Sequence, residues 1–549
     1  MQRDTLRRSL VAVLFVGGLA CANGSVSSDG TGGSSAEGGS TGLGGNSASG
    51  GSTGRGGEVG SGGNPGTGGS VATGGHSGNT GGTGTGTGGA ADSTGGHVGS
   101  GGTTGTGGAT GSGGHLGTGG TGAGSGGSAT GGSGSGGAGG AYMGTKTPGT
   151  PQSGDITVDP TKLHQVVDGF GEADVWQGSS STQMQTLLWD PVNGIGLNLL
   201  RVGIDGTSGS PNIMGAAGYA DGQACMKFSG SDCKVWAAPW SPPASMKDNN
   251  NVNNGGHLNS GNYAAWAKVL AGFPAFYKSH GGVDLYALSA QNEPDFTASY
   301  QSCLFNASQM VAWINVLGPA LAALSPPVKV LAAEPDNWGN IWGGDGYGPA
   351  IIADANANMY VGPIATHDYG GTSAGTYGRP APPSNNTHHV WETECTPGDT
   401  GPITIATMIY AAFTSGGVNG WHYWWTQALV PSASSPPPQV YALGNFSKYV
   451  RPGYYRVDVS NAPKASGTTP LVVAFTNLSD GTVSIVVVNG GGAANVSFFV
   501  AGTAWPASVT PYLTTTSSKL AAGTPISVSG ARFSASIAAQ SVTTFVGKP

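Results

Sequence analysis

The stretch Leu285-Tyr286-Ala287-Leu288-Ser289-Ala290-Gln291-Asn292-Glu293-Pro294 runs from an apolar segment into a polar ending. Its apolar part, residues 285–290, has the length of one buried β-strand. Before it, Tyr263–Lys278 carries apolar residues at three-to-four residue spacing and is closed by Gly281-Gly282, which predicts a helix. A helix followed by a buried strand is the repeating unit of an α/β fold.

The same unit recurs along the chain. A second helix is predicted over 403–415, closed by Gly416-Gly417. The predicted strands cover residues 165–170, 197–203, 235–239, 285–290, 328–333, 364–367, 388–393 and 418–424. Eight strands alternating with helices over roughly 280 residues predict an α/β fold, a (β/α)8 TIM barrel, which we place at residues 151–455.

After Tyr455 the pattern changes to short β segments separated by Gly, Asn and Pro. The predicted strands cover residues 471–475, 483–489, 496–500, 509–513, 526–529, 532–537 and 542–546. They indicate an all-β sandwich at 456–549, into which a strand near 155–158 also pairs. We expect this domain to support the barrel rather than bind sugar, because its aromatic residues are sparse.

Two glutamates stand where predicted strands end, Glu293 after the fourth strand and Glu394 after the seventh. Active sites of TIM barrels lie at the carboxyl ends of the strands, so both side chains should face one cleft. Splitting an acetal needs one carboxylic acid to protonate the leaving oxygen and one carboxylate to attack or to activate water. The pair therefore predicts glycoside hydrolysis.

Composition separates the amino-terminal part from the rest. Residues 22–150 are rich in Gly, Ser and Thr without apolar periodicity, which predicts a disordered linker. Charged residues make up 9% of the 549 residues and the net charge is -7, so no basic stripe for nucleic acid is present. We expect a monomer.

The first 21 residues have the pattern of a signal peptide. Arg3, Arg7 and Arg8 precede the apolar run 10–16, which is too short to span a bilayer. The run is followed by Gly18-Leu19-Ala20-Cys21, which resembles a bacterial lipoprotein cleavage box. The prediction is an extracellular protein or one anchored to the outer surface through a lipid on Cys21.

Four cysteines follow the linker, and an even number in an exported chain permits two disulfides. Cys225 and Cys233 suit a local bridge, and Cys303 with Cys395 would tie two loops together. No Cys or His spacing is typical of zinc, and no calcium motif is present. We expect neither metal nor cofactor.

The chain from about Asp155 to Pro549 resembles glycoside hydrolase family 30, and its later part resembles the bacterial endo-xylanase branch. The motifs that carry the resemblance are Val167-Asp168-Gly169-Phe170-Gly171, Leu200-Arg201-Val202, Ala238-Pro239-Trp240-Ser241-Pro242-Pro243, Gln291-Asn292-Glu293-Pro294-Asp295, Thr366-His367-Asp368-Tyr369-Gly370, Trp391-Glu392-Thr393-Glu394, Asn445–Tyr454 and Ala539–Val546.

The resemblance implies a role for each site residue. Glu293 would be the general acid/base and Glu394 the nucleophile of a retaining enzyme. Asn292 would bind the sugar 2-hydroxyl, and Arg201 and Tyr369 would orient Glu394 and keep it ionised. The tryptophans expected to wall the sugar subsite are Trp176, Trp240 and Trp424.

Other carboxylates compete for these roles. Strand alternation places Glu392 on the same face as Glu394, so position and resemblance alone favour Glu394. Glu334 imitates the acid motif but lacks the preceding asparagine, which favours a structural role. Glu172, Asp174 and Asp205 also stand at strand ends, where they either shape subsites or face solvent.

Substrate choice stays open at the loop after the eighth strand. Related xylanases that require glucuronic acid branches hold the branch with an arginine there, but residues 424–436 contain neither Arg nor Lys. The resemblance, with this departure, therefore implies cleavage of internal β-1,4 bonds of plant cell-wall xylan without dependence on glucuronate. The alternatives are an endo-β-1,6-galactanase or other β-glycanase, and a catalytically silent glycan-binding protein.

Overall fold

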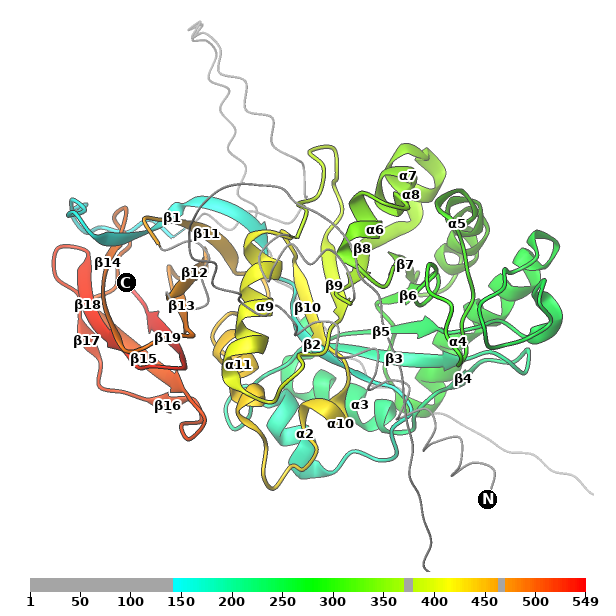
Figure 1. Cartoon of the computed structure of the whole chain (residues 1–549), viewed down its shortest axis with the longest axis horizontal. Helices are drawn as coiled ribbons and strands as arrows, with labels where there is room; N and C mark the ends of the chain where they lie inside the picture. Colours follow the sequence, from blue (N-terminus) through cyan, green and yellow to red (C-terminus); the bar gives the residue numbers. More distant parts are fainter. Residues whose placement is uncertain (1–141, 370–378, 463–469) are drawn as a thin grey trace, which may run out of the picture. The chain divides into compact units, whose positions relative to one another are not determined.

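The computed structural model describes residues 142–369, 379–462 and 470–549 (Figure 1). The predicted signal peptide, Cys21 and nearly all of the predicted linker lie outside the described residues. No helix in the described ranges is long and apolar enough to cross a bilayer.

The central element is a closed parallel barrel, as the sequence predicts. Its eight strands are β2 (Gly169–Asp174), β3 (Leu199–Asp205), β5 (Lys234–Pro239), β6 (Ala287–Ser289), β7 (Lys329–Ala333), β8 (Val361–His367), β9 (Val390–Glu394) and β10 (Gly420–Tyr423). Each pairs with the next, and β10 pairs with β2 to close the ring. A short antiparallel strand, β4 (Asn212–Ile213), adds to β3. The barrel strands are almost entirely buried, as expected where helices cover a parallel sheet.

Helices follow most of the barrel strands, and Figure 1 shows them around the strands. They are α2 (Thr182–Trp189), α3 (Ala217–Ser229), α4 (Tyr263–Gly281), α5 (Ala307–Ala322), α6 (Trp338–Trp342), α7 (Tyr347–Ala353), α8 (Ala355–Tyr360), α9 (Pro402–Thr414), α10 (Thr426–Leu429) and α11 (Pro438–Ser447). The predicted helices 263–278 and 403–415 are α4 and α9. A left-handed Gly282 ends α4, and its amide donates to the Lys278 carbonyl.

A second sheet contains the remaining strands. They are β1 (Asp155–Val166), β11 (Tyr455–Ser460), β12 (Leu471–Thr476), β13 (Val483–Asn489), β14 (Ala494–Val500), β15 (Ser508–Thr514), β16 (Ala521–Ala522), β17 (Ile526–Ser527), β18 (Arg532–Ile537) and β19 (Ser541–Gly547). The sheet bends over its own core, because Phe498 of β14 and Phe533 of β18 pack against Phe545 of β19. The predicted strand near 155–158 pairs here with β11 and β14.

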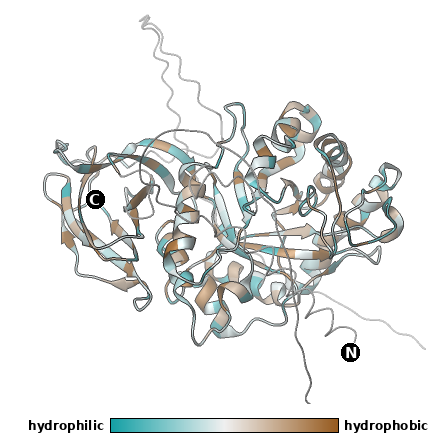
Figure 2. Ribbon diagram, viewed as in Figure 1, coloured by the Kyte–Doolittle hydropathy of each residue, from teal (hydrophilic) through white to brown (hydrophobic). Residues whose placement is uncertain are grey.

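The first barrel strand begins about four residues later than the sequence predicts. Residues 165–166 end β1 of the second sheet, and the barrel strand begins only at Gly169. One apolar run, 165–170, is thus divided between two sheets, and hydrophobicity alone does not mark the division. Figure 2 shows hydrophobic residues along the barrel strands β3 and β5, which contribute to the main core.

The cysteine predictions had different outcomes. Cys225 and Cys233 form the predicted disulfide between α3 and the turn that follows it. The predicted bridge from Cys303 to Cys395 is wrong, because both are buried thiols in different surroundings. Cys395 Sγ lies 3.9 Å from Met408 Sδ, whereas Cys303 packs near Lys247 and Tyr263.

Candidate active site

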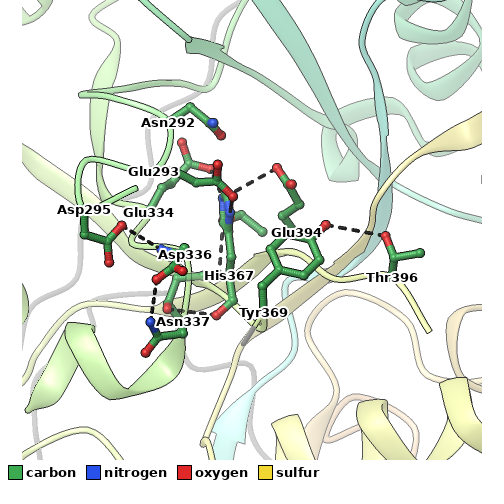
Figure 3. A network of polar contacts seen from close by, with 12 residues as sticks. Asn292, Glu293, Asp295, Glu334, Asp336, Asn337, His367, Tyr369, Glu394 and Thr396 are labelled. Atoms are coloured by element: carbon green, nitrogen blue, oxygen red, sulfur yellow. Dashed lines mark hydrogen bonds and ion pairs between the residues drawn. The ribbon is translucent and has the colours of Figure 1, made fainter. Parts of the chain in front are cut away.

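Glu293 and Glu394 come together at the carboxyl ends of the barrel strands (Figure 3). Glu293 follows β6 in a left-handed conformation (φ 45°), and Glu394 is the last residue of β9. Both side chains are almost completely buried. One oxygen of each carboxyl and a ring nitrogen of His367 all lie within 4.8 Å of one another. The two glutamates therefore share one site, as the sequence predicts.

A register shift in β9 separates Glu394 from Glu392. Thr366 of β8 pairs with Glu392, whereas the next residue, His367, pairs with Glu394. This irregularity cancels the alternation that would put both glutamates on one face. Glu392 instead accepts hydrogen bonds from Trp338 and Trp421, away from the barrel interior. The structure thus corrects the expectation of a shared face.

His367, the last residue of β8, lies between the carboxyls. Its Nδ1 is 3.2 Å from Glu293 Oε1, and its Nε2 is 3.3 Å from Glu334 Oε1 and 3.7 Å from Glu394 Oε2. Burial lowers the pKa of His367, but the surrounding glutamates outweigh it and raise the pKa to about 10. The imidazole is therefore a buried cation near neutral pH.

Arg201 of β3 is the second cation, and it is fully buried. Its guanidinium donates to Glu394 and to Asn292 Oδ1, which is the predicted contact with the nucleophile. The rings of Trp240 and Trp424 lie 4.9 Å and 5.4 Å from its central carbon. Because Asn292 uses its oxygen for Arg201, its Nδ2 group is left to donate to a ligand.

Glu334 lies deeper in the same cluster. Ser289 donates to it, and Arg201 Nη2 approaches it to 3.1 Å. Burial favours its neutral form, but Arg201 and then His367 outweigh burial and hold the pKa of Glu334 below its usual value. This agrees with a structural role. Burial also raises the pKa of Glu394, against the opposing effects of His367 and Arg201, so the expectation that Arg201 and Tyr369 keep it ionised leaves out burial and His367.

The cluster combines two cations with three carboxyls. Arg201 and His367 supply two positive charges beside three carboxyls, Glu293, Glu334 and Glu394. A single proton on the carboxyls balances the charge in a place where a net charge is costly. Glu293 contacts His367 alone of the two cations, whereas the other two glutamates also contact Arg201. Glu293 is therefore the carboxyl of the cluster with the fewest cationic contacts.

Two tyrosines border the carboxyls. The Tyr369 hydroxyl shares a hydrogen bond of 3.4 Å with Thr396 Oγ1, and Figure 3 shows its ring beside Glu394. The Tyr300 hydroxyl donates to Glu293 Oε2 at 3.4 Å. Tyr369 thus lies at the site, and its hydrogen bond to Glu394 stays a prediction, whereas Tyr300 is an addition.

The three predicted tryptophans form one aromatic group at the site. Trp176 meets Trp240 at 5.2 Å and Trp424 at 5.9 Å between ring centroids. Trp240 and Trp424 are mostly buried against Arg201, and Trp176 is more exposed. Trp176 therefore presents the accessible part of this wall.

Two carboxylates of β2, Glu172 and Asp174, neither shape a subsite nor face solvent, which are the two roles that the sequence predicts for them. Glu172 and Asp174 are completely buried on the side of β2 that faces the helices. Thr426 of α10 donates to Glu172, and Asp174 lies beside Asp221 of α3. Alternation along β2 puts Ala173, not these carboxylates, in the barrel interior. Asp205 holds the turn that follows β3, accepting from Thr207.

His367 and Tyr300 are site residues that the sequence pattern does not single out. His367 ends a barrel strand just as Glu394 does, which was an available signal. Tyr300 lies in the loop after β6, where spacing carries no such signal. Two carboxylates and an imidazole could in principle hold a metal, but here Arg201 already neutralises Glu394 and the ring of His367 is itself cationic. We assign no metal to the site.

A separate hollow of about 490 Å³ lies between the loop after β5 and the start of α5, and its lining includes Asp248, His257 and Tyr263. None of the site residues described above lines it. It is distinct from the carboxyl pair.

The known proteins that are similar to this chain include members of glycosyl hydrolase family 30. Residues 222–391 match the family model described as the glycosyl hydrolase family 30 TIM-barrel domain. A family 30 subfamily 8 xylanase from Clostridium acetobutylicum is 30% identical, with a TM-score of 0.62, over 72% of this chain and 100% of that one. A family 30 endoxylanase from Clostridium papyrosolvens is 27% identical, with a TM-score of 0.60, over 72% and 100%. The glucuronoxylanase XynC of Bacillus subtilis is 27% identical over 71% of this chain and 91% of its own length.

Proposed function

Because the chain belongs to glycosyl hydrolase family 30 and is an O-glycosyl hydrolase, we propose that it cleaves internal β-1,4 bonds of xylan with retention of configuration. The proximity of Glu293 and Glu394, whose nearest oxygens lie within 4.8 Å, carries the proposal. Retaining enzymes place the two carboxyls about 5 to 5.5 Å apart, whereas inverting enzymes leave roughly 6.5 to 9.5 Å for a water. The xylan specificity is supported by the xylanase relatives, which span both the barrel and the second sheet.

The reaction follows from the placement of the side chains. Glu293 gives its proton to the leaving oxygen while Glu394 attacks the anomeric carbon and forms a glycosyl-enzyme. Glu293 then takes a proton from water, which displaces Glu394. Arg201 orients Glu394, and Asn292, oriented by the same guanidinium, donates to the sugar 2-hydroxyl. Trp176 offers an apolar face to the pyranose ring.

We also propose that glucuronic acid branches are not required. Residues 424–436 contain no Arg or Lys, so this loop supplies no guanidinium to bind the branch carboxylate. In the structure Thr426 starts α10 and donates to the buried Glu172. Its hydroxyl therefore serves internal packing.

We also propose that the protein is exported, because a polysaccharide such as xylan is too large to enter a cell. The basic and apolar residues before Cys21 support it, and fractionation of expressing cells would test it. Recovery of the full protein in the cytoplasm alone would refute it.

Product analysis with four polymers tests the function. We expect cleavage of glucuronoxylan and of debranched xylan at comparable rates, and none of β-1,6-galactan or β-1,6-glucan. Proton magnetic resonance should show the β-anomer as the first product. Cleavage of galactan alone would favour the endo-galactanase alternative, and no cleavage of any polymer would favour a glycan-binding protein.

Glu394→Gln is the matching variant. It should lower kcat by at least about 10⁴-fold, because it removes the nucleophile, while the fold stays intact. Asp284→Asn, an exposed carboxylate that pairs with Lys278, is the control and should leave activity unchanged. Substantial turnover by Glu394→Gln would disprove the nucleophile assignment.

A further inference from the structure

A second pair of carboxyl groups lies beside the catalytic acid. Glu293-Pro294-Asp295 after β6 and Glu334-Pro335-Asp336 after β7 are the same three residue types in neighbouring loops. Both glutamates have left-handed backbone conformations, with φ of 45° and 61°. The two loops lie side by side, because the Glu293 amide donates to the Glu334 carbonyl at 3.1 Å. Asp295 and Asp336 therefore occupy equivalent positions two residues beyond each glutamate.

The two aspartates join these loops (Figure 3). The Asp336 amide donates to Asp295 Oδ1 at 2.9 Å, and Asn340 donates to Asp295 Oδ2 at 2.7 Å. Asn337 donates to Asp336. The carboxyl groups of Asp295 and Asp336 lie within hydrogen-bonding reach of each other. A hydrogen bond between two carboxyl groups requires a proton on one of them, because two carboxylates offer only acceptors.

The surroundings favour one retained proton. Burial and Asp336 raise the pKa of Asp295 to about 7, and burial also raises the pKa of Asp336. The charged or titratable groups that face the pair are Glu293 from the β6 loop, His367 from β8, and Tyr347 at the start of α7, which also interacts with Asp345. His367 is the single cation among these described groups, and it already contacts three glutamates.

The β7 loop is also fixed on its other side. The His367 amide donates to the Pro335 carbonyl, and the Tyr369 amide donates to the Asp336 carbonyl, both at 2.9 Å. Asp336 is thus held by β8, and through its side chain it holds the residue two positions after Glu293. The only residue between Glu293 and Asp295 is Pro294, whose ring limits backbone rotation. A displacement of Asp295 would therefore move Glu293.

We propose that Asp295 and Asp336 share one proton, and that this proton locks the loop of the acid Glu293 to the neighbouring loop. Loss of the proton turns the contact into a repulsion between two carboxylates, so that Glu293 loses its fixed position toward the leaving oxygen. The pair is a positioning device. Its kinetic part rests on the proposed function, whereas the shared proton itself does not.

The shared proton is tested without any substrate. Difference infrared spectra of the whole protein, taken across neutral pH, should contain the carbonyl band of one protonated carboxyl that vanishes with a midpoint near 7. Asp336→Asn should lack this band, because an amide donates to Asp295 in place of the proton. Asp284→Asn, an exposed aspartate, should keep the band. A wild-type spectrum without such a band, or the band surviving in Asp336→Asn and in Asp295→Asn alike, would overturn the proposal.

The positioning role is tested by kinetics on whichever polymer the wild-type enzyme cleaves. Below neutral pH, Asp336→Asn has the same net charge on the pair as wild type. Above neutral pH, the variant keeps a hydrogen bond between the two side chains, which wild type loses. The ratio of its kcat to the wild-type kcat should therefore rise several-fold as the pH passes 7, with KM little changed. A flat or falling ratio would refute the positioning role. If the extra negative charge acted only through electrostatics, it would favour the acid form needed for catalysis in wild type and would not raise the kcat of the variant relative to the wild-type kcat.

Asp336→Ala should lose activity at all pH values on polymers and lose less on aryl glycosides with activated leaving groups, which need little acid assistance. Equal losses on both substrates would likewise overturn it. An enzyme inactive on all polymers would refute the proposed function and leave the infrared result standing.

Discussion

At the scale of single residues, burial and partners decide what a carboxyl does. All five glutamates of the described ranges are buried, so exposure does not distinguish them. Glu293, Glu334 and Glu394 converge on His367, whereas Glu172 and Glu392 face the helices. Two cations beside three carboxyls leave one proton to be held, and that proton is the reagent of an acid-catalysed reaction. The reactivity of this site is a property of the cluster.

His367 should contribute to both stability and rate. Its pKa is about 10 in the folded protein against 6.5 unperturbed. The stabilisation from its charge is therefore complete below pH 6.5 and is lost as the pH rises through 10, and the loss amounts to a few kcal/mol. The free energy of unfolding of His367→Gln should not show this decline at alkaline pH. It should also lower kcat by about 10- to 100-fold through mispositioned glutamates.

Urea unfolding near pH 6 and near pH 10 measures the effect of His367 on the free energy of unfolding. Wild type and His367→Gln should differ most at the acidic end and converge at the alkaline end. Parallel losses of stability in the two proteins would show that His367 is not the titrating group.

At the scale of the element, side chains alternate regularly between the two faces of β2, whereas this alternation is broken in β9. Neither strand allows the site to be predicted from alternation alone. Alternation in β2 correctly puts Glu172 and Asp174 on one face, but helices cover that face, so the carboxylates are buried away from the cleft. The register shift after Glu392 puts Glu392 and Glu394 on opposite faces. The shift cannot be predicted from the residues Trp391-Glu392-Thr393-Glu394, because it arises from pairing with β8.

The buried carboxyls of β2 and α3 should make stability depend on pH. Burial and Asp221 raise the pKa of Asp174 well above its usual value, and no donor in the described ranges other than Asp221 reaches its oxygens. A carboxyl with a raised pKa stabilises the fold fully below its unfolded pKa near 4, and this contribution is lost as the pH rises. Asp174→Asn should therefore raise the free energy of unfolding at pH 8 by about 1 to 3 kcal/mol and change it little at pH 4.

Denaturant titrations at the two pH values check this expectation, with Asp284→Asn as the exposed control. Equal effects of Asp174→Asn at both pH values would mean that ionisation of the cluster does not limit stability. A loss of stability at pH 8 would mean that the carboxylate has a favourable partner there.

At the scale of the whole molecule, the eight strands, the β domain and its amino-terminal strand were all predictable, because local periodicity encodes them. The division of 165–170 between two sheets was not predictable, since it depends on which partner strand is near. The structure also shows why the β domain accompanies the barrel. Phe413 of α9 packs on Phe475 of β12 with ring centroids 5.5 Å apart, and one apolar cluster contains both barrel helices and a face of the second sheet. The β domain is a continuation of the barrel core.

Asn445 of α11 is one of the polar links in this interface, and it is completely buried. Its Nδ2 donates to the Tyr512 carbonyl at 2.9 Å and to Thr544 Oγ1 at 3.0 Å, and Thr544 donates to the Asn445 carbonyl at 2.7 Å. Asn445→Ala leaves buried groups of β15 and β19 without a donor, which should cost about 2 to 4 kcal/mol. Asn495→Ala, at an exposed position of β14, should be nearly neutral.

Because the core is shared, the barrel and the second sheet should unfold together. Of the 13 tryptophans, all except Trp505 lie in the barrel part of the chain, so fluorescence reports mainly on the barrel while far-ultraviolet circular dichroism reports on both parts. The two signals should give one coincident transition in wild type, and Asn445→Ala should move both midpoints equally. If Asn445→Ala shifted only one of the two signals, the domains would be separable, and the β domain would have to be regarded as an appendage. Coincident shifts would instead explain why an enzyme whose chemistry lies wholly within the barrel carries a second sheet.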